Sequence, residues 1–234
     1  MENNNLLIDL HVHSEFSYDC YTPIEKIIKI SKKLRLNGIA ITDHNTIVGG
    51  VKAKKFEKQD FKIIIGSEIT LENGLEILGL FLNEDIKSKT FFEVYDEIKR
   101  QDGIIILPHP FRRAKYNISK ISEEEFLKIK IIEGINAGNY YEENEKAKKL
   151  AKEKKLILTA GSDAHHYSSI GKAYTIFEKT DIDLRKQINK GMIKVAGKCL
   201  NKIERQREFL SRELKIKNYK IIKDAYVDLK DKIK

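Results

Sequence analysis

Short apolar runs rich in β-branched residues alternate along this chain with longer segments in which apolar residues recur at helical spacing. This alternation is typical of an α/β fold built on a parallel sheet, because parallel strands need crossover connections that are usually helices. We expect strands at 6–12, 38–42, 61–69, 103–108, 129–135, 156–161 and, at the periphery, 172–178. The clearest helix ranges are 22–38, 90–103 and 142–155. Residues 74–81 follow a strand closely, and we predict a hairpin-like excursion there.

The first predicted helix has signals at both ends. Thr22 is expected as its N-cap, Pro23 as its first helical residue and Glu25 as the capping-box partner. Gly38 is the predicted exit.

The pattern of charged and apolar residues changes after about Gly197. Apolar residues then recur at alternating spacings of three and four, which predicts an amphipathic helix; they are Tyr219, Ile222, Tyr226, Leu229 and Ile233. We predict a main domain over 1–197 and a basic helical extension over 198–234 that packs on it. An arm that binds a partner or a nucleic acid is the alternative.

Length and composition fit one domain with an appendage. The 234 residues are 41% apolar, which is enough for one large core. No apolar stretch approaches the roughly 20 residues of a membrane span, and the N-terminus lacks the pattern of a signal peptide. We therefore expect a cytoplasmic protein that does not enter a membrane. Cys20 and Cys199 are too few for a disulfide framework or a cysteine-based zinc site, and we expect two free thiols.

The positive charge is concentrated at the C-terminus. The formal net charge is +9, and residues 201–234 contribute eleven Lys/Arg against six Asp/Glu. This imbalance favours anionic partners, but composition alone does not separate a nucleic-acid binder from a protein with a lysine-rich, solvated surface.

Every one of the six histidines follows an apolar run, where the C-terminal ends of parallel strands gather. In the first strand Asp9, His11 and His13 share one face, so the two imidazoles converge beyond its end and Asp9 can hold a ring nitrogen from behind. Carboxylates also occur near the C-terminal ends of the predicted strands. The full set is His11, His13, Asp19, Asp43, His44, Glu68, His109, Asp163, His165 and His166.

Imidazoles and carboxylates without thiolates favour Zn²⁺, Mn²⁺ or Fe²⁺ over Ca²⁺ or Mg²⁺. The set is too large for one ion, so it predicts two or three divalent ions that share bridging carboxylates. Glu68, the lone carboxylate at the third strand, is the bridging candidate.

The motifs DLHVHS, ITDHNT, GSEIT, PHPF and GSDAHH, in this order, resemble the PHP (polymerase and histidinol phosphatase) family of metal-dependent phosphoesterases over residues 6–177. The resemblance implies a distorted, TIM-like (β/α)₇ barrel with up to three metal ions at the C-terminal ends of its strands. The ligands it implies are His11, His13, Asp19, His44, Glu68, His109, Asp163 and His165. Asp9 and Asp43 would support them from behind.

Two positions depart from the family pattern. Glu76 stands in the hairpin where some relatives place a histidine, and it can still ligate. Asn136 stands at a strand end where other branches place a ligand; we expect it to contact substrate or to support a ligand, with ordinary loop capping as the alternative.

The remaining candidates are groups that handle phosphate. Arg112 and Arg113 follow His109 closely, and a guanidinium binds phosphate through paired hydrogen bonds. We expect one of them to reach a substrate phosphate and favour Arg113. His166 is either a proton donor or only a neighbour of the ligands.

These features predict a phosphoesterase that hydrolyses a small phosphomonoester with a metal-activated water. The substrates we expect are a nucleotide, a nucleoside 3′,5′-bisphosphate or the end of a short oligonucleotide. Histidinol phosphate and longer nucleic acid are alternatives, and a metal-stabilised binding module is the non-enzymatic one.

Overall fold

The computed structural model describes residues 4–113 and 118–232, with side chains described as far as Lys220. The strands are β1 (Asn5–Val12), β2 (Gly38–Ile41), β3 (Lys62–Thr70), β4 (Glu76–Leu80), β5 (Ile104–Ile106), β6 (Ile131–Asn136), β7 (Ile157–Gly161), β8 (Ala173–Glu178) and β9 (Ile193–Gly197). The α-helices are α1 (Ile24–Lys33), α2 (Val48–Ala53), α3 (Phe91–Arg100), α4 (Glu123–Lys128), α5 (Tyr141–Lys154), α6 (Leu184–Asn189) and α7 (Lys202–Lys232). Two 3₁₀ turns cover Lys54–Phe56 and Ile118–Lys120.

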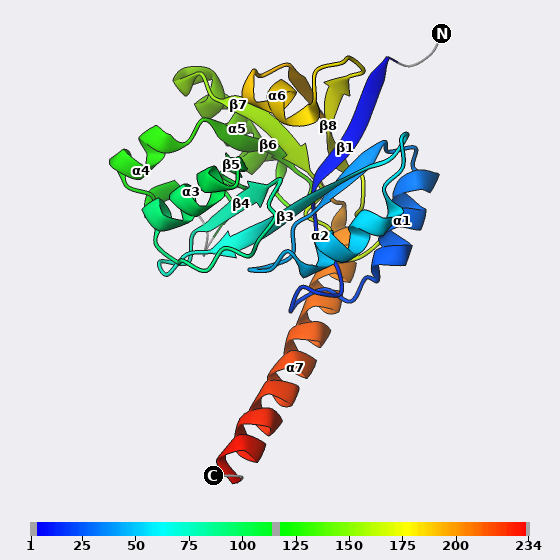
Figure 1. Cartoon of the computed structure of the whole chain (residues 1–234), viewed down its shortest axis with the longest axis vertical. Coiled ribbons are helices and arrows are strands. Elements are labelled where there is room, and N and C mark those ends of the chain that lie inside the picture. Colours follow the sequence, from blue (N-terminus) through cyan, green and yellow to red (C-terminus); the bar gives the residue numbers. More distant parts are fainter. Residues whose placement is uncertain (1–3, 114–117, 233–234) are drawn as a thin grey trace.

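Seven strands form one curled sheet in the order β5-β4-β3-β2-β1-β8-β9, and β6 and β7 form a second, parallel pair (Figure 1). A bridge between Leu107 and Ile132 joins the end of β5 to β6, and the residues after β7 bond to β1 through the amide of Asp163 and the carbonyl of His11. The fold is therefore mixed α/β with a sheet curled into a half-barrel, which confirms the predicted TIM-like α/β class.

Strands β1, β2, β3, β5, β6 and β7 run in the same direction, so their C-terminal ends meet at one mouth of the curl. The hairpin strand β4 is antiparallel to β3, as predicted for residues 74–81, and its first residue, Glu76, lies at that same mouth. An apolar cluster that includes Ile8, Leu78 and Phe177 draws on strands all around the sheet and fills the inside of the curl. Larger apolar clusters lie under α1 and under α3 and α5.

The sequence prediction of the sheet was wrong at one edge. The strand expected at the periphery is β8, which lies between β1 and β9 and is antiparallel to both. Strand β9 was not predicted, because its alternation of half-buried and exposed residues is short and carries several charges nearby.

The N-terminal cap of the first helix was also predicted wrongly. Helix α1 begins at Ile24 with Pro23 in the cap position, and Thr22 makes no capping bond. The carboxylate of Glu15 accepts a hydrogen bond from the Ile24 amide instead, at 3.3 Å. The helix ends at Lys33, and Arg35, two residues later, adopts a positive φ. Gly38, the predicted exit, is instead the first residue of β2.

Helix α7 begins on the barrel and projects far beyond it (Figure 1). Tyr219 is half-exposed and its ring lies 6.3 Å from that of Tyr18. The side chains of Ile222, Tyr226 and Leu229, and the whole of Ile233, lie outside the described residues. In the described part of the chain, no helix combines the length and apolar character that crossing a membrane requires.

Candidate metal centre

The strand ends at the mouth bring all nine predicted metal ligands into one buried cluster. Each is at most 7% exposed, and they are His11, His13, Asp19, His44, Glu68, Glu76, His109, Asp163 and His165. The backbone bends sharply at two of them, since His109 and Asp163 have φ values of +29° and +54°. Left-handed conformations are uncommon outside glycine, although Asp and His adopt them more often than most residues, and here they turn the chain so that the side chain enters the cluster.

Three groups within the cluster have ligand atoms close enough to hold one ion each. They are His13, Asp19, His44 and His165; His11, His13, Glu68 and Asp163; and His44, Glu68 and Glu76. His13, His44 and Glu68 each belong to two groups. His109 adds to the third group, with its Nε2 2.9 Å from Glu68 and 3.5 Å from Glu76.

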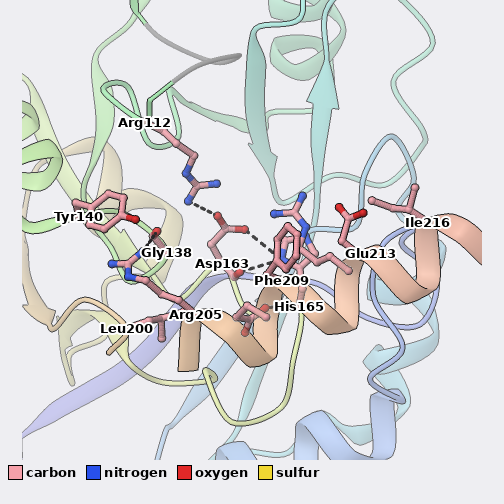
Figure 2. A pocket seen from close by; sticks show the side chains of 12 residues that line it. Arg112, Gly138, Tyr140, Asp163, His165, Leu200, Arg205, Phe209, Glu213 and Ile216 are labelled. Carbon is pink, nitrogen blue, oxygen red and sulfur yellow. Dashed lines mark hydrogen bonds and ion pairs between the residues drawn. The ribbon is translucent and has the colours of Figure 1, made fainter. Parts of the chain in front are cut away.

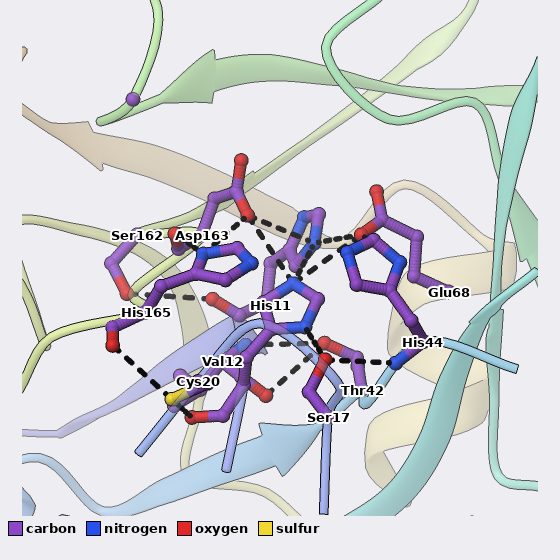
Figure 3. A network of polar contacts seen from close by, with 12 residues as sticks. His11, Val12, Ser17, Cys20, Thr42, His44, Glu68, Ser162, Asp163 and His165 are labelled. Atoms are coloured by element: carbon purple, nitrogen blue, oxygen red, sulfur yellow. Dashed lines mark hydrogen bonds and ion pairs between the residues drawn. The ribbon is translucent and has the colours of Figure 1, made fainter. Parts of the chain in front are cut away.

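The imidazoles point their nitrogens at one another. The Nε2 atoms of His11 and His13 are 3.2 Å apart, and both lie 3.3 Å from the Glu68 Oε2 atom. Figure 3 shows His11, His44 and His165 converging with Glu68 and Asp163 in this way. Electron pairs that face each other in a buried site need a cation or protons between them.

Hydrogen bonds on the far side of three rings fix which nitrogen faces the cluster. The His11 Nδ1 atom lies 3.1 Å from a Glu133 carboxylate oxygen, and the His165 Nδ1 atom lies 3.0 Å from the Asp163 carbonyl oxygen. Since these oxygens accept, the proton lies on Nδ1 and Nε2 is left to ligate. The Ser17 hydroxyl lies 3.5 Å from the His13 Nδ1 atom.

The described residues leave some of the buried nitrogens in the cluster without a hydrogen bond. Both ring nitrogens of His44 and the Nε2 atom of His165 are in this position, although carboxylate oxygens of Asp19 and Glu68 lie 3.0 to 3.5 Å from them. A buried polar atom with no partner is costly, and imidazole nitrogens beside carboxylates are the donors that Zn²⁺, Mn²⁺ and Fe²⁺ prefer. The residues present therefore fit divalent metal ions.

Burial and the neighbouring groups together set the pKa values in the cluster. Burial by itself raises the pKa of Asp163, but Arg112 and His11 outweigh it and hold that pKa well below its usual range. Burial followed by the charge of Glu68 raises the pKa of Glu76 to about 8. Burial lowers the pKa of His13, yet hydrogen bonds to Asp163 and Glu68 raise it to about 9 overall.

Arg112 lies against the cluster (Figure 2). Its guanidinium donates to Asp163 at 2.5 Å, to the Asn136 side-chain oxygen at 2.8 Å and to the Asn139 side-chain oxygen at 3.0 Å. Asn136 is fully buried, and its amide nitrogen donates to Glu133 at 2.8 Å. Asn136 thus links Arg112 to the residue that supports His11.

Two predicted residues lie away from the cluster. The Arg113 side chain is 81% exposed, and its guanidinium lies 5.6 Å from the Tyr140 ring. His166 is half-buried, with its Nδ1 atom 2.8 Å from the Ser168 hydroxyl and its ring against Tyr167. Among the described residues, neither side chain makes a hydrogen bond to a candidate ligand. Arg113 nevertheless lines the cavity of about 540 Å³ that His44 and Glu68 also line, so its contact with substrate stays a prediction.

The two supporting aspartates hold backbone rather than imidazoles. Asp9 accepts from the amides of Ser162 at 2.8 Å and Gly171 at 2.9 Å, and Asp43 accepts from the Ser14 amide at 2.6 Å. The expectation that Asp9 holds a ring nitrogen was wrong. β1 is irregular between Asp9 and Val12, and Glu133 from β6 takes that role.

Sequence reasoning missed several residues that support the cluster. Glu133 is a lone carboxylate inside an apolar strand, a signal that could have been read. No such signal marks Ser17, in the loop after β1. None marks the three supporting residues on α7 either, because the docking of this helix depends on the whole fold; they are Arg205, Glu208 and Arg212.

The chain is similar in sequence to a known family and to known proteins. The PHP domain family model matches residues 9–234. An uncharacterized protein of Methanocaldococcus jannaschii is 34% identical over 183 residues, which cover 75% of this chain and 72% of the relative.

Two solved structures share the fold. A two-domain protein from Bacteroides vulgatus that contains a predicted PHP-like metal-dependent phosphoesterase superposes with a TM-score of 0.68 at 19% identity, over 89% of this chain and 70% of that one. Endonuclease Q, in complex with a 27-mer duplex with an abasic lesion at the active site, superposes with a TM-score of 0.66 at 18% identity. That superposition covers 82% of this chain and 60% of the endonuclease.

Proposed function

Because the chain belongs to the PHP domain family, whose model matches residues 9–234, we propose that it hydrolyses a small phosphomonoester with two or three divalent metal ions. The substrates we propose are a nucleotide, a nucleoside 3′,5′-bisphosphate or the end of a short oligonucleotide. The observation that carries this proposal is the convergence of nine buried candidate ligands, eight of which form three overlapping groups while the ninth, His109, lies beside the third.

When bound, such ions supply an activated water and positive charge for the phosphoryl oxygens. The chain's own residues prepare the site for them. Glu133 and the Asp163 carbonyl hold His11 and His165 with Nε2 toward the cluster. Arg112, fixed by three acceptors, places a guanidinium beside Asp163, where it can orient a phosphoryl group.

The one cysteine near the cluster is unsuited to nucleophilic attack. Cys20 is fully buried, and its thiol donates to the carbonyls of His13 and His165. Burial raises the pKa of this thiol to about 12, so it stays protonated at neutral pH. This agrees with attack by water.

Phosphate release by metal-quantified protein with added Mn²⁺ tests the proposal. The panel contains nucleotides, 3′,5′-bisphosphates, histidinol phosphate and short 5′-phosphorylated oligonucleotides. We expect one strongly preferred phosphomonoester. Two or more bound ions with no phosphate released from any of these substrates would refute the proposal.

A nuclease acting on longer chains is a second candidate, favoured by α7. This helix begins beside the cluster and carries exposed cations, among them Lys217 and Lys220. A polymer held through several phosphates loses affinity steeply with salt, whereas a small monoester loses little. Measuring KM between about 50 and 200 mM salt separates the two candidates.

A further inference from the structure

Helix α7 is bound to the active-site mouth through one polar face. Arg205, Glu208 and Arg212 are spaced by three and four residues, so they lie on the same side of the helix. Each contacts a different loop at the strand ends: those after β6, β7 and β1, respectively. An exposed apolar side chain on the same helix, Phe209, also lines the space above the cluster (Figure 2).

Two of these three side chains hold the helix to the loops through paired hydrogen bonds to backbone groups. The Arg205 guanidinium donates to the carbonyl oxygens of Gly138 and Asn139, and it lies 4.3 Å from the Tyr140 ring. The Glu208 carboxylate accepts from the amides of His165 at 3.0 Å and His166 at 3.1 Å. They fix the helix in position, which places the third side chain.

Arg212 is placed differently, because it reaches the candidate ligands themselves. Its Nη2 atom lies 2.8 Å from the Oδ2 atom of Asp19, a fully buried carboxylate. The same oxygen lies 3.0 Å from the His165 Nε2 atom and 3.4 Å from the His44 Nε2 atom. The guanidinium of Arg212 thus contacts a carboxylate oxygen of Asp19, which belongs to one of the three groups that could hold an ion.

Arg212 and Arg112 also border the same empty space. Two adjoining cavities of about 430 and 540 Å³ lie over the cluster, and both are lined by these two arginines together with Asp163 and His165. Arg112 enters from the loop after β5, and Arg212 enters from α7. A phosphoryl group in this space would have a guanidinium on either side.

The two guanidiniums differ in how many of their donors are engaged. Arg112 donates to three acceptors, Asp163, Asn136 and Asn139. Within the described part of the chain, Arg212 makes a single ion pair, with Asp19. If a cation neutralises that carboxylate, the donors of Arg212 are left for another anion in the cavity.

We propose that Arg212 binds the phosphoryl group of the substrate from the side opposite Arg112, so that α7 forms part of the active site. This inference rests on the proposed function. It assigns a substrate-binding role to a helix that sequence reasoning treats as an extension.

Binding of inorganic phosphate, the expected product, tests this role without relying on turnover. The metal-loaded full chain is titrated with phosphate in a calorimeter, and bound metal is counted in the same samples. The variants are Arg212→Ala, Arg212→Lys and, as matched control, Arg207→Ala, which removes an exposed arginine of the same helix.

We expect Arg212→Ala to weaken phosphate binding by about 10- to 100-fold with unchanged metal content, the usual scale for a hydrogen bond to a charged group. Arg212→Lys should restore part of the affinity, because the charge returns without the paired donors. Arg207→Ala should bind phosphate like the wild type.

Two results would overturn the role of Arg212: wild-type phosphate affinity in Arg212→Ala, or a loss of metal that accompanies the loss of phosphate. The second would mean that Arg212 supports the ligands rather than the phosphate. A wild-type protein that binds its metals but neither binds phosphate nor hydrolyses any ester would instead contradict the proposed function.

Discussion

Glu68 is the side chain that connects most of the candidate ligands. Its Oε2 atom lies 3.3 Å from both His11 and His13, and its Oε1 atom lies 2.9 Å from His109. A carboxylate with both oxygens engaged in this way can bridge two cations. Glu76 lies next to it in the hairpin and belongs to one of the same ligand groups.

Glu68→Gln should remove this bridge while keeping the shape of the side chain. We expect the protein to lose at least one bound ion and its turnover to fall by at least about 10²-fold, because an amide offers one neutral oxygen in place of a charged pair. Metal analysis and phosphate release measure the two effects. Glu72→Gln, an exposed carboxylate just after the same strand, is the control; equal metal content in both variants would contradict a bridging role.

Metal uptake should release protons at neutral pH. The pKa values of Glu76 and His13 in the metal-free chain are about 8 and about 9, so both groups hold a proton at pH 7 that a ligand must lose. We expect about two protons per chain from these groups near pH 7, and fewer as the pH rises through about 8 and 9. Calorimetric titrations in buffers of different ionisation enthalpy count them, and a count that does not change with pH would contradict these assignments.

At the scale of elements, the strand ends determine the ligands and α7 completes their support. Most of the candidate ligands could be predicted from the sequence because they follow an apolar run, and parallel strands bring such positions together. Asp19 and Glu76 could be named only through the resemblance to the family. Arg205, Glu208 and Arg212 could not be predicted, since nothing local shows where a surface helix docks. Glu133 stands out as a lone carboxylate in an apolar strand, but its contact with His11 depends on pairing between β5, β6 and β7 that no short stretch of sequence encodes.

Glu208→Ala tests whether the helix supports the metal site. Without this carboxylate the amides of His165 and His166 lose their acceptor, and the loop that carries His165 loosens. We expect metal affinity to fall by about 10- to 100-fold, the usual effect of removing a residue that orients a ligand. Competition with a fluorescent chelator measures it. Gln206→Ala, an exposed neighbour, should leave the affinity unchanged, and a similar affinity in both variants would exclude a supporting role.

At the scale of the molecule, the apolar clusters inside the curl and under the helices contain none of the candidate ligands. In the metal-free chain the ligands also pair with one another, for example Glu68 with His109 and Asp19 with His165. The fold therefore has a core that does not depend on the ions.

Chelation should consequently inactivate the protein without unfolding it. We expect the far-ultraviolet circular dichroism at 25 °C to be unchanged and Tm to fall by about 10 °C for each ion removed, since an ion present at 1,000 times its Kd contributes about 4 kcal/mol. Re-addition of Mn²⁺ should restore both Tm and activity. Global unfolding on chelation would point instead to a metal-stabilised binding module.

The most direct test of the account is a titration of the chelated protein with Mn²⁺ in which bound ions and phosphate release are followed together on the preferred substrate. The three overlapping ligand groups predict that two or three ions bind and that release begins only after more than one is bound. Full activity with a single ion per chain, or release that continues without added or bound metal, would contradict it.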